Sequence, residues 1–212
     1  MGAMNAAARY LSQLDPAFRE LIRRTGPRRE KPEPREPYEA LVRAIAFQQL
    51  HGTAARTILG RFLALFPGQP FPAPEQVLAL STEAMRACGF SASKTAAIRD
   101  IALHASIGVV PTRRAAARMP DAALIERLTV IRGVGRWTVE MLLIFTLGRP
   151  DILPVDDFGV REGWKVSAGL DEQPKPKALA AIGEAWAPWR SIAAWYLWRA
   201  ADAAKRSTFK PQ

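Results

Sequence analysis

The chain has 212 residues, of which 49% are hydrophobic and 24% are charged, a composition typical of a folded protein that argues against disorder. Its 30 Lys and Arg residues against 20 Asp and Glu give a net charge of +10, which favours an acidic partner, although an arginine-rich proteome would give the same excess. The only cysteine, Cys88, excludes an intramolecular disulfide and a four-cysteine metal or iron–sulfur site, and no apolar run reaches the roughly 18 residues of a membrane span.

The N-terminal part predicts helices followed by an extended connector. Apolar residues recur at helical spacing over residues 5–24, and Asp15-Pro16 is typical of a helix start, so we expect two short helices. We leave residues 1–4 out of the fold because they resemble a cloning remnant. Residues 26–37 hold four prolines among alternating charges, which predicts an extended connector or a mobile arm. Its Arg28 and Arg29 are expected in solvent, with contact to an acidic partner as the alternative.

A polar insert interrupts the next apolar stretch. Residues 38–66 have the period of one or two helices, and Gln48-Gln49-Leu50-His51-Gly52 lies between their apolar parts. Such an insert is either a helix junction that faces a partner or a set of core amides satisfied by the backbone. The residues alone leave both interpretations open.

Four further helices are predicted over residues 74–80, 81–87, 93–107 and 121–130, each opened by Ser, Thr, Asp or Pro. Ser93 and Lys94 follow a tight turn, and this helix start is a candidate phosphate site, although plain capping explains Ser93 equally well. Cys88 has apolar neighbours, and His104 has no second ligand near it, so neither predicts chemistry. Because no segment alternates apolar and polar residues as a strand does, the predicted fold is all-α.

The stretch from Leu128 to Thr138 predicts a helix end, a Gly-x-Gly hairpin at Gly133 and Gly135, and a new helix near Arg136. The first N–H groups of that helix have no partner within it. Together with the helix dipole, Arg132 and Arg136, they make a seat for a phosphate.

After an apolar helix over residues 138–147, a turn from Leu153 to Asp157 brings Asp156 and Asp157 to the start of another helix. The tail, residues 179–199, contains Trp186, Trp189, Trp195 and Trp198 among alanines. Aromatic residues at helical spacing are most often core residues. Residues 128–199 therefore contain a predicted phosphate-binding helix start, a pair of carboxylates and a tryptophan-rich segment.

The hairpin Gly133-Val-Gly-Arg-Trp-Thr138, the Pro-Val-Asp-Asp turn about twenty residues later and the tryptophan-rich tail resemble the helix-hairpin-helix (HhH-GPD) DNA glycosylases, and most closely the 3-methyladenine DNA glycosylase II (AlkA-like) branch. The resemblance covers residues 38–200, and the chain is expected to lack the small N-terminal β domain of the larger family members. It implies two helical lobes flanking a cleft. It also implies a monofunctional enzyme that flips alkylated purines of the 3-methyladenine type out of duplex DNA and hydrolyses the N-glycosidic bond, in base excision repair.

The resemblance assigns roles to individual residues. The catalytic carboxylate is Asp157 by its spacing from Trp137, or alternatively Asp156 by its spacing from Pro154; if Asp157 acts, Asp156 is expected to cap the helix or support Asp157. Trp137 replaces the lysine of strand-cleaving relatives, which predicts that the product is an abasic site. The remaining assignments are a base pocket of Trp137, Trp198, Trp195 and Tyr196, a wedge and minor-groove pair of Gln49 and His51, and phosphate binding by Arg132, Gly133, Gly135, Arg136 and Thr138.

No cofactor is required by this reading, and no iron–sulfur cluster is expected. The resemblance implies a structural Na⁺ or K⁺ on the carbonyls of Leu128, Ile131 and Gly133. The expected partner is duplex DNA with damaged bases, bound by a monomer in the cytoplasm at the nucleoid, with no membrane contact.

The expected domains are residues 1–37, packing on the C-terminal helices, residues 38–148 with the hairpin at about 128–139, and residues 149–212 with the Asp turn and Trp-rich helices. The rival interpretations are a non-catalytic helix-hairpin-helix DNA-binding protein, which has no use for carboxylates beside phosphates, and a glycosylase for oxidised or mismatched bases.

Overall fold

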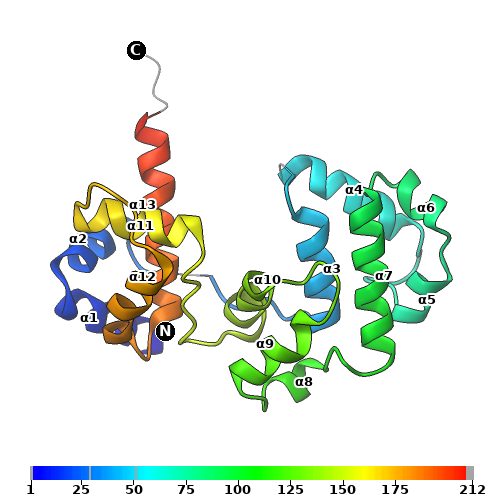
Figure 1. Ribbon diagram of the computed structural model, residues 1–212, viewed down its shortest axis with the longest axis horizontal. Coiled ribbons are helices and arrows are strands. Elements are labelled where there is room, and N and C mark those ends of the chain that lie inside the picture. Colours follow the sequence, from blue (N-terminus) through cyan, green and yellow to red (C-terminus); the bar gives the residue numbers. More distant parts are fainter. Residues whose placement is uncertain (1, 29, 51, 209–212) are drawn as a thin grey trace. The chain divides into compact units, whose positions relative to one another are not determined.

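The computed structural model describes residues 2–28, 30–50 and 52–208, and these ranges hold helices and no strand, which confirms the predicted all-α fold (Figure 1). The chain forms two compact units. Unit 1 combines Met1–Lys31 with Gly148–Gln212, and unit 2 is Pro32–Leu147. Each unit is described by itself, and the predicted cleft between two lobes stays a prediction. Within the described ranges no helix is long and apolar enough to cross a membrane.

Unit 1 is built around one long C-terminal helix. Its helices are α1 (Gly2–Leu14), α2 (Pro16–Thr25), α11 (Phe158–Ala168), α12 (Pro176–Gly183), the 3₁₀ turn η2 (Glu184–Trp186) and α13 (Arg190–Thr208). The two predicted N-terminal helices are confirmed, with the Asp15 side chain accepting a hydrogen bond from Ala17 N at 2.7 Å. The first helix begins at Gly2, so residues 2–4, which were left out of the predicted fold, are part of α1. Both α1 and α2 pack against α13.

Aromatic rings fill the core of unit 1. The centroids of Phe18, Trp164 and Trp186 lie 5.1–5.8 Å from one another, and Trp186 is only 2% exposed. Rings at these separations add contact energy beyond the area they bury. Part of the tryptophan-rich tail therefore stabilises the fold.

Two glycines let α11 and α13 approach closely. A Cβ atom added to Gly163 would lie 1.9 Å from the carbonyl oxygen of Leu197, a backbone atom that has no room to move aside. One turn earlier, a Cβ atom on Gly159 would lie 2.8 Å from Cδ1 of Trp198. At these two positions α11 approaches the backbone of Leu197 and the side chain of Trp198 in α13 at distances that only glycine permits.

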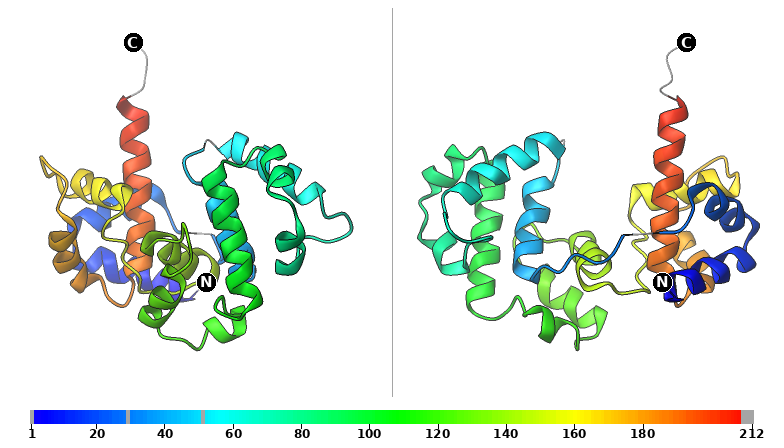
Figure 2. Two further views of the ribbon diagram at one scale, coloured as in Figure 1. Left: turned by 45° about the vertical axis from the view of Figure 1, so that its right-hand side comes forward. Right: turned by 180° about the vertical axis from the view of Figure 1, so that it is seen from behind.

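Unit 2 contains α3 (Pro37–Phe47), α4 (Gly52–Ala64), α5 (Pro74–Ala79), α6 (Thr82–Ala87), α7 (Ala92–Ser106), α8 (Arg113–Ala116), α9 (Asp121–Thr129), α10 (Arg136–Met141) and the π-helical turn η1 (Leu142–Leu147). The long helix α7 lies beside α3 and also packs on α5 (Figure 2). The predicted helices are present, but α7 begins at Ala92, because Ser91 rather than Ser93 accepts the capping bond from Lys94 N at 3.2 Å. The four-residue helix α8 was not predicted, since so short a segment has no visible period.

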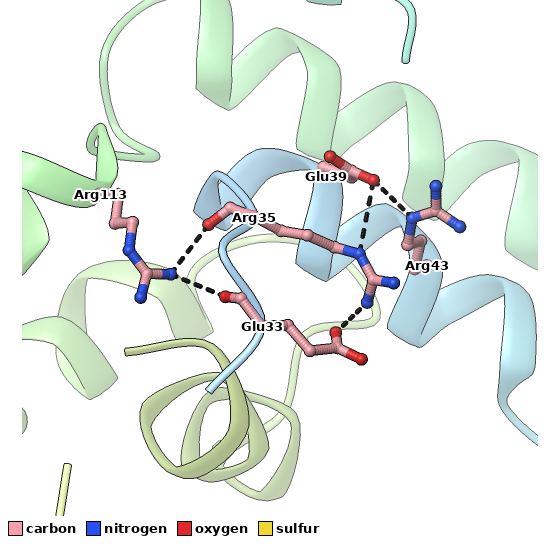
Figure 3. A network of polar contacts seen from close by, with 5 residues as sticks. All are labelled: Glu33, Arg35, Glu39, Arg43 and Arg113. Atoms are coloured by element: carbon pink, nitrogen blue, oxygen red, sulfur yellow. Dashed lines mark hydrogen bonds and ion pairs between the residues drawn. The ribbon is translucent and has the colours of Figure 1, made fainter. Parts of the chain in front are cut away.

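The proline-rich connector is fastened to unit 2 at residues 33–35 (Figure 3). One guanidinium nitrogen of Arg113 donates to the carbonyl oxygens of Glu33 and Arg35 at 2.9 and 3.2 Å. Arg35 pairs with Glu33 and Glu39, and Glu39 also pairs with Arg43 at 2.7 Å. Exposed ion pairs contribute little, so we attribute the fastening mainly to the backbone contacts of Arg113.

Arg28, in the unit 1 part of the connector, is only 8% exposed, and burial lowers the pKa of its guanidinium group. The prediction that this residue lies in solvent was therefore wrong. Arg29 lies outside the described residues.

We predict that Gly163→Ala destabilises the protein by about 3 kcal/mol, because the new methyl group would overlap the backbone of α13. Gly60→Ala is the matched control, since Gly60 is also inside a helix but has no atom within 4 Å of an added Cβ. That variant should gain about 0.5–1 kcal/mol. Urea unfolding monitored by circular dichroism measures both changes, and equal effects would contradict the proposed close approach.

Candidate active site

Asp157 caps the N-terminus of α11 and holds an indole at the same time. Its Oδ1 atom accepts hydrogen bonds from Val160 N and from Trp198 Nε1, each at 2.8 Å. Asp156 is exposed, and the expectation that it caps this helix was wrong, because Asp157 does so. Two donors from two helices thus fix the orientation of the Asp157 carboxylate.

Gly159 makes room for this arrangement. A Cβ atom at this position would lie 2.8 Å from Trp198 Cδ1 and 3.1 Å from Asp157 Oδ1. The sequence reading missed this residue. The signal was a glycine in the first turn of a helix. Glycine lowers helix stability relative to alanine there, so its presence suggests that another part of the protein packs too closely for a side chain.

An ion pair anchors the start of α13 to the loop that leads to Asp157. Arg190 donates to both carboxylate oxygens of Asp151 at 2.7 Å, and Ile152 N donates to Ser191 Oγ at 2.9 Å. The hydrogen bonds from Arg190 lower the pKa of the Asp151 carboxyl group below its usual value. This bidentate contact, which the sequence reading also missed, fixes one end of the helix that carries Trp198.

The four aromatic residues predicted for the base pocket have different surroundings. In unit 1, Trp195 and Tyr196 are 5% and 1% exposed and belong to the core, and the Tyr196 hydroxyl donates to the carbonyl oxygen of Gly26 at 3.2 Å. Trp198 is partly exposed beside Asp157. In unit 2, Trp137 is 46% exposed at the start of α10. Burial therefore favours a structural role for Trp195 and Tyr196.

The hairpin between α9 and α10 has the predicted form. Gly133 has a φ of 79°, Val134 N donates to Ile131 O at 3.0 Å, and α10 begins at Arg136. A Cβ atom on Gly133 would lie 3.0 Å from the Cβ atom of Ala97 in α7. Both the backbone conformation and the close packing on α7 require glycine here.

The side chains predicted for phosphate binding differ in their exposure to solvent. Arg132 and Arg136 are exposed, and Arg136 Nε also pairs with the buried Glu140 at 2.9 Å. Thr138 is only 4% exposed, so its side chain faces the interior. The backbone N–H of Arg132 donates to Asp100 Oδ2 at 2.7 Å, which ties the hairpin to α7.

The carbonyls proposed for a structural cation already take part in the hairpin. Leu128 O accepts from Ile131 N at 3.2 Å, and Gly133 O accepts from the Gln48 amide at 3.4 Å. Each carbonyl oxygen retains a second lone pair, so the site stays a prediction. Among the described residues, no group of three or more His, Cys, Asp or Glu side chains could hold a metal ion.

Residues 48–50, the first part of the polar insert after α3, form a turn. Gln49 is exposed and has a φ of 55°, a left-handed conformation that is uncommon for residues other than glycine. The interpretation as a buried amide is therefore wrong for Gln49. His51, its predicted companion, lies outside the described residues.

Lys94, predicted as a second phosphate contact with Ser93, binds backbone carbonyls of unit 2. Its Nζ atom donates to Ala46 O at 2.8 Å and to Gln48 O at 2.6 Å, and burial lowers the pKa of its ammonium group. Ser93 is exposed, with its Oγ atom 3.0 Å from Ser91 Oγ.

Cys88 and His104 have ordinary structural surroundings. Cys88 is 4% exposed, and burial raises the pKa of its thiol, which disfavours the reactive thiolate. His104 Nδ1 lies 2.8 Å from the carbonyl oxygen of Asp100 in the same helix.

We predict that Gly133→Ala destabilises the protein by about 2 kcal/mol, because alanine is strained at positive φ and its methyl group would press on Ala97. Gly135→Ala should change stability by about 0.5 kcal/mol or less, since its φ is −86° and the added methyl group meets no atom. There, the weaker helix cap and the less flexible unfolded chain offset each other. Thermal unfolding of both variants tests this, and equal losses would contradict it.

We predict that Asp151→Asn lowers stability by about 1 kcal/mol at pH 7, a value reduced for the partial exposure of the pair. Because the folded-state pKa of Asp151 is lowered, its contribution is fully present above the unfolded value of about 3.8 and is lost as the pH falls through the folded pKa. The difference between the variant and the wild type in urea unfolding should therefore shrink below about pH 4. A constant difference from pH 7 to pH 3.5 would refute the assignment.

Comparison with known proteins identifies relatives of this chain in sequence and in structure. Residues 42–188 match the family described as HhH-GPD superfamily base excision DNA repair protein. DNA-3-methyladenine glycosylase 1 of Schizosaccharomyces pombe is 44% identical over 93% of this chain and 87% of its own length. The solved structure of that organism's 3-methyladenine DNA glycosylase (Mag1) with abasic DNA superposes with a TM-score of 0.85 at 42% identity, covering 97% of this chain and 100% of that one.

A second solved structure gives the same result. The DNA-3-methyladenine glycosidase of Bacillus halodurans superposes with a TM-score of 0.84 at 34% identity and covers 94% of this chain and 91% of its own. The family match spans the hairpin, the Asp turn and the start of the tryptophan-rich tail. The resemblance found in the sequence is thereby confirmed, and the chain belongs to the HhH-GPD superfamily of base excision DNA repair proteins.

Proposed function

We propose that the protein is a monofunctional DNA glycosylase that removes alkylated purines of the 3-methyladenine type from damaged duplex DNA. The observation that carries the proposal is the Asp157 carboxylate, fixed by Val160 N and Trp198 Nε1 at the start of α11. The names of the relatives support the substrate class, since both are called 3-methyladenine DNA glycosylases. Catalysis by a fixed carboxylate suits the hydrolysis of a glycosidic bond.

The reaction develops positive charge on the sugar. As the bond between C1′ and the base breaks, the deoxyribose becomes oxocarbenium-like, and a carboxylate held nearby stabilises that charge or orients the attacking water. Asp157 fits this task because its side chain is restrained, whereas Asp156 is exposed at the surface. Water adds to C1′, the free base leaves, and an abasic site remains.

An alkylated purine carries positive charge already and needs little help from an acid to leave. Aromatic faces attract such a cation by stacking and cation–π interaction. The faces that we propose are Trp198, beside Asp157, and Trp137, exposed at the start of α10. Because Trp137 is not an amine, it offers no Schiff-base chemistry, which supports a monofunctional enzyme.

The proposed DNA contacts lie in unit 2. The N-terminus of α10, with Arg132 and Arg136, binds a backbone phosphate, and the exposed Gln49 fills the gap left by the extruded nucleotide. His51 is proposed as its minor-groove companion. We propose that the enzyme acts as a monomer on nucleoid DNA in the cytoplasm.

We predict that Asp157→Asn lowers the single-turnover rate of base release from methylated duplex DNA by about 100-fold or more, because the neutral amide no longer stabilises the sugar cation. Asparagine retains an oxygen that can accept the bonds from Val160 and Trp198, so folding and DNA binding should persist. Asp156→Asn, the matched control, should leave the rate unchanged.

Chromatography of the released bases and fluorescence anisotropy of the DNA complex provide the two readouts. A loss confined to Asp156→Asn would transfer the catalytic role to Asp156. Tight binding without base release by the wild type would instead support a non-catalytic DNA-binding protein.

A further inference from the structure

Helix α7 carries two cations that each bind the C-terminal end of another helix in unit 2. Lys94 Nζ donates to Ala46 O and Gln48 O, at 2.8 and 2.6 Å, where α3 ends. Arg99 donates to Leu80 O and Leu78 O, at 2.6 and 3.2 Å, where α5 ends. A cation suits these positions, because the last carbonyls of a helix lack partners within it and carry the negative end of its dipole.

The turn that Lys94 holds is the one that presents Gln49. Its two bonds join the last turn of α3 to the residue immediately before Gln49. Gln49 itself has a φ of 55°, and a residue other than glycine persists in that conformation only when its surroundings enforce it. Lys94 supplies part of that restraint, since one of its two acceptors is the carbonyl that forms the peptide bond to Gln49.

The same helix also holds the hairpin. The Cβ atom of Ala97 lies 3.0 Å from the position of a Cβ on Gly133, and Asp100 Oδ2 accepts from Arg132 N at 2.7 Å. The Gln48 amide in turn reaches Gly133 O at 3.4 Å. Within unit 2, α7 therefore fixes the Gln49 turn and the phosphate-binding hairpin in a common frame.

We propose that Lys94 is a positioning residue for base extrusion, holding the turn from Gln48 to Leu50 so that Gln49 enters the DNA at a fixed place relative to the hairpin. This inference rests on the proposed glycosylase function. Lys94 acts through the backbone of the turn and not through a phosphate, which differs from the role expected from the sequence. Arg99 has the same chemistry on the end of a different helix, α5, makes no bond to the turn among the described residues, and is expected to contribute to stability alone.

The test uses the full chain and compares Lys94→Met, Lys94→Arg and Arg99→Met. The first readout is single-turnover base release from methylated duplex DNA. The second is the fluorescence of 2-aminopurine opposite a tetrahydrofuran abasic analogue, which reports insertion into the gap without requiring chemistry. The third is the dependence of the dissociation constant on salt, and thermal unfolding provides the stability of each variant.

For Lys94→Met we expect the rate of base release to fall by roughly 10- to 100-fold, as for other small misplacements of a substrate, and the fluorescence change to be lost. The salt dependence should stay that of the wild type. Lys94→Arg, which keeps a donor cation, should recover part of both signals. Arg99→Met should lower the unfolding temperature and leave release and fluorescence unchanged.

Three outcomes would overturn the inference. Wild-type fluorescence and release in Lys94→Met would show that the turn needs no such restraint. A fall in the salt slope by about one unit would identify Lys94 as a phosphate contact. Equal losses in Arg99→Met would show a general effect of stability. If the wild type itself neither releases base nor changes the fluorescence, the proposed function fails, which is distinct from a failure of the Lys94 variants alone.

Discussion

The contact between Asp157 and Trp198 depends on how closely α11 and α13 approach each other. Trp198 Nε1 reaches Asp157 Oδ1 at 2.8 Å because Gly159 leaves space for the indole and Gly163 lets the helix pack against the carbonyl of Leu197. A larger side chain at either glycine would separate the two helices. The carboxylate would then keep its place as a helix cap but lose its second donor, and with it the defined orientation that its proposed role, the stabilisation of a sugar cation, requires.

In unit 2, a single helix, α7, holds two loops in place. The hairpin and the Gln49 turn are loops, which carry function well but are mobile unless something holds them. Packing of Ala97 on Gly133, the bond from Arg132 N to Asp100 and the bonds of Lys94 all come from α7. The hairpin and the Gln49 turn are thus held by α7. The N-terminus of this helix is capped by Ser91, and it is longer than α3 and α5, on which it packs.

Elements with a local signal could be predicted from the sequence. The Asp15 cap, the hairpin glycines and the carboxylates at a helix start are all encoded within a few residues, and the structure shows each of them. Residues whose role depends on a distant partner could not be predicted. Asp151 meets Arg190 across 39 positions of the chain, and nothing local to either residue indicates the pair. The same holds for Lys94. Its position at a helix N-terminus suggested a phosphate contact, whereas its partners are backbone carbonyls 48 and 46 residues away.

The net charge also shows that a role which depends on distant partners cannot be predicted from the sequence. Several arginines that contribute to the value of +10 are engaged within the protein, where they bind the carbonyls or carboxylates of other segments: Arg99, Arg113, Arg127 and Arg190. Guanidinium groups suit this task because their planar donors reach two acceptors at once. A count of charges therefore overstates the surface available to a phosphate backbone. In the proposed function, recognition of DNA depends instead on where a few exposed groups are held, at the hairpin and the turn that α7 supports.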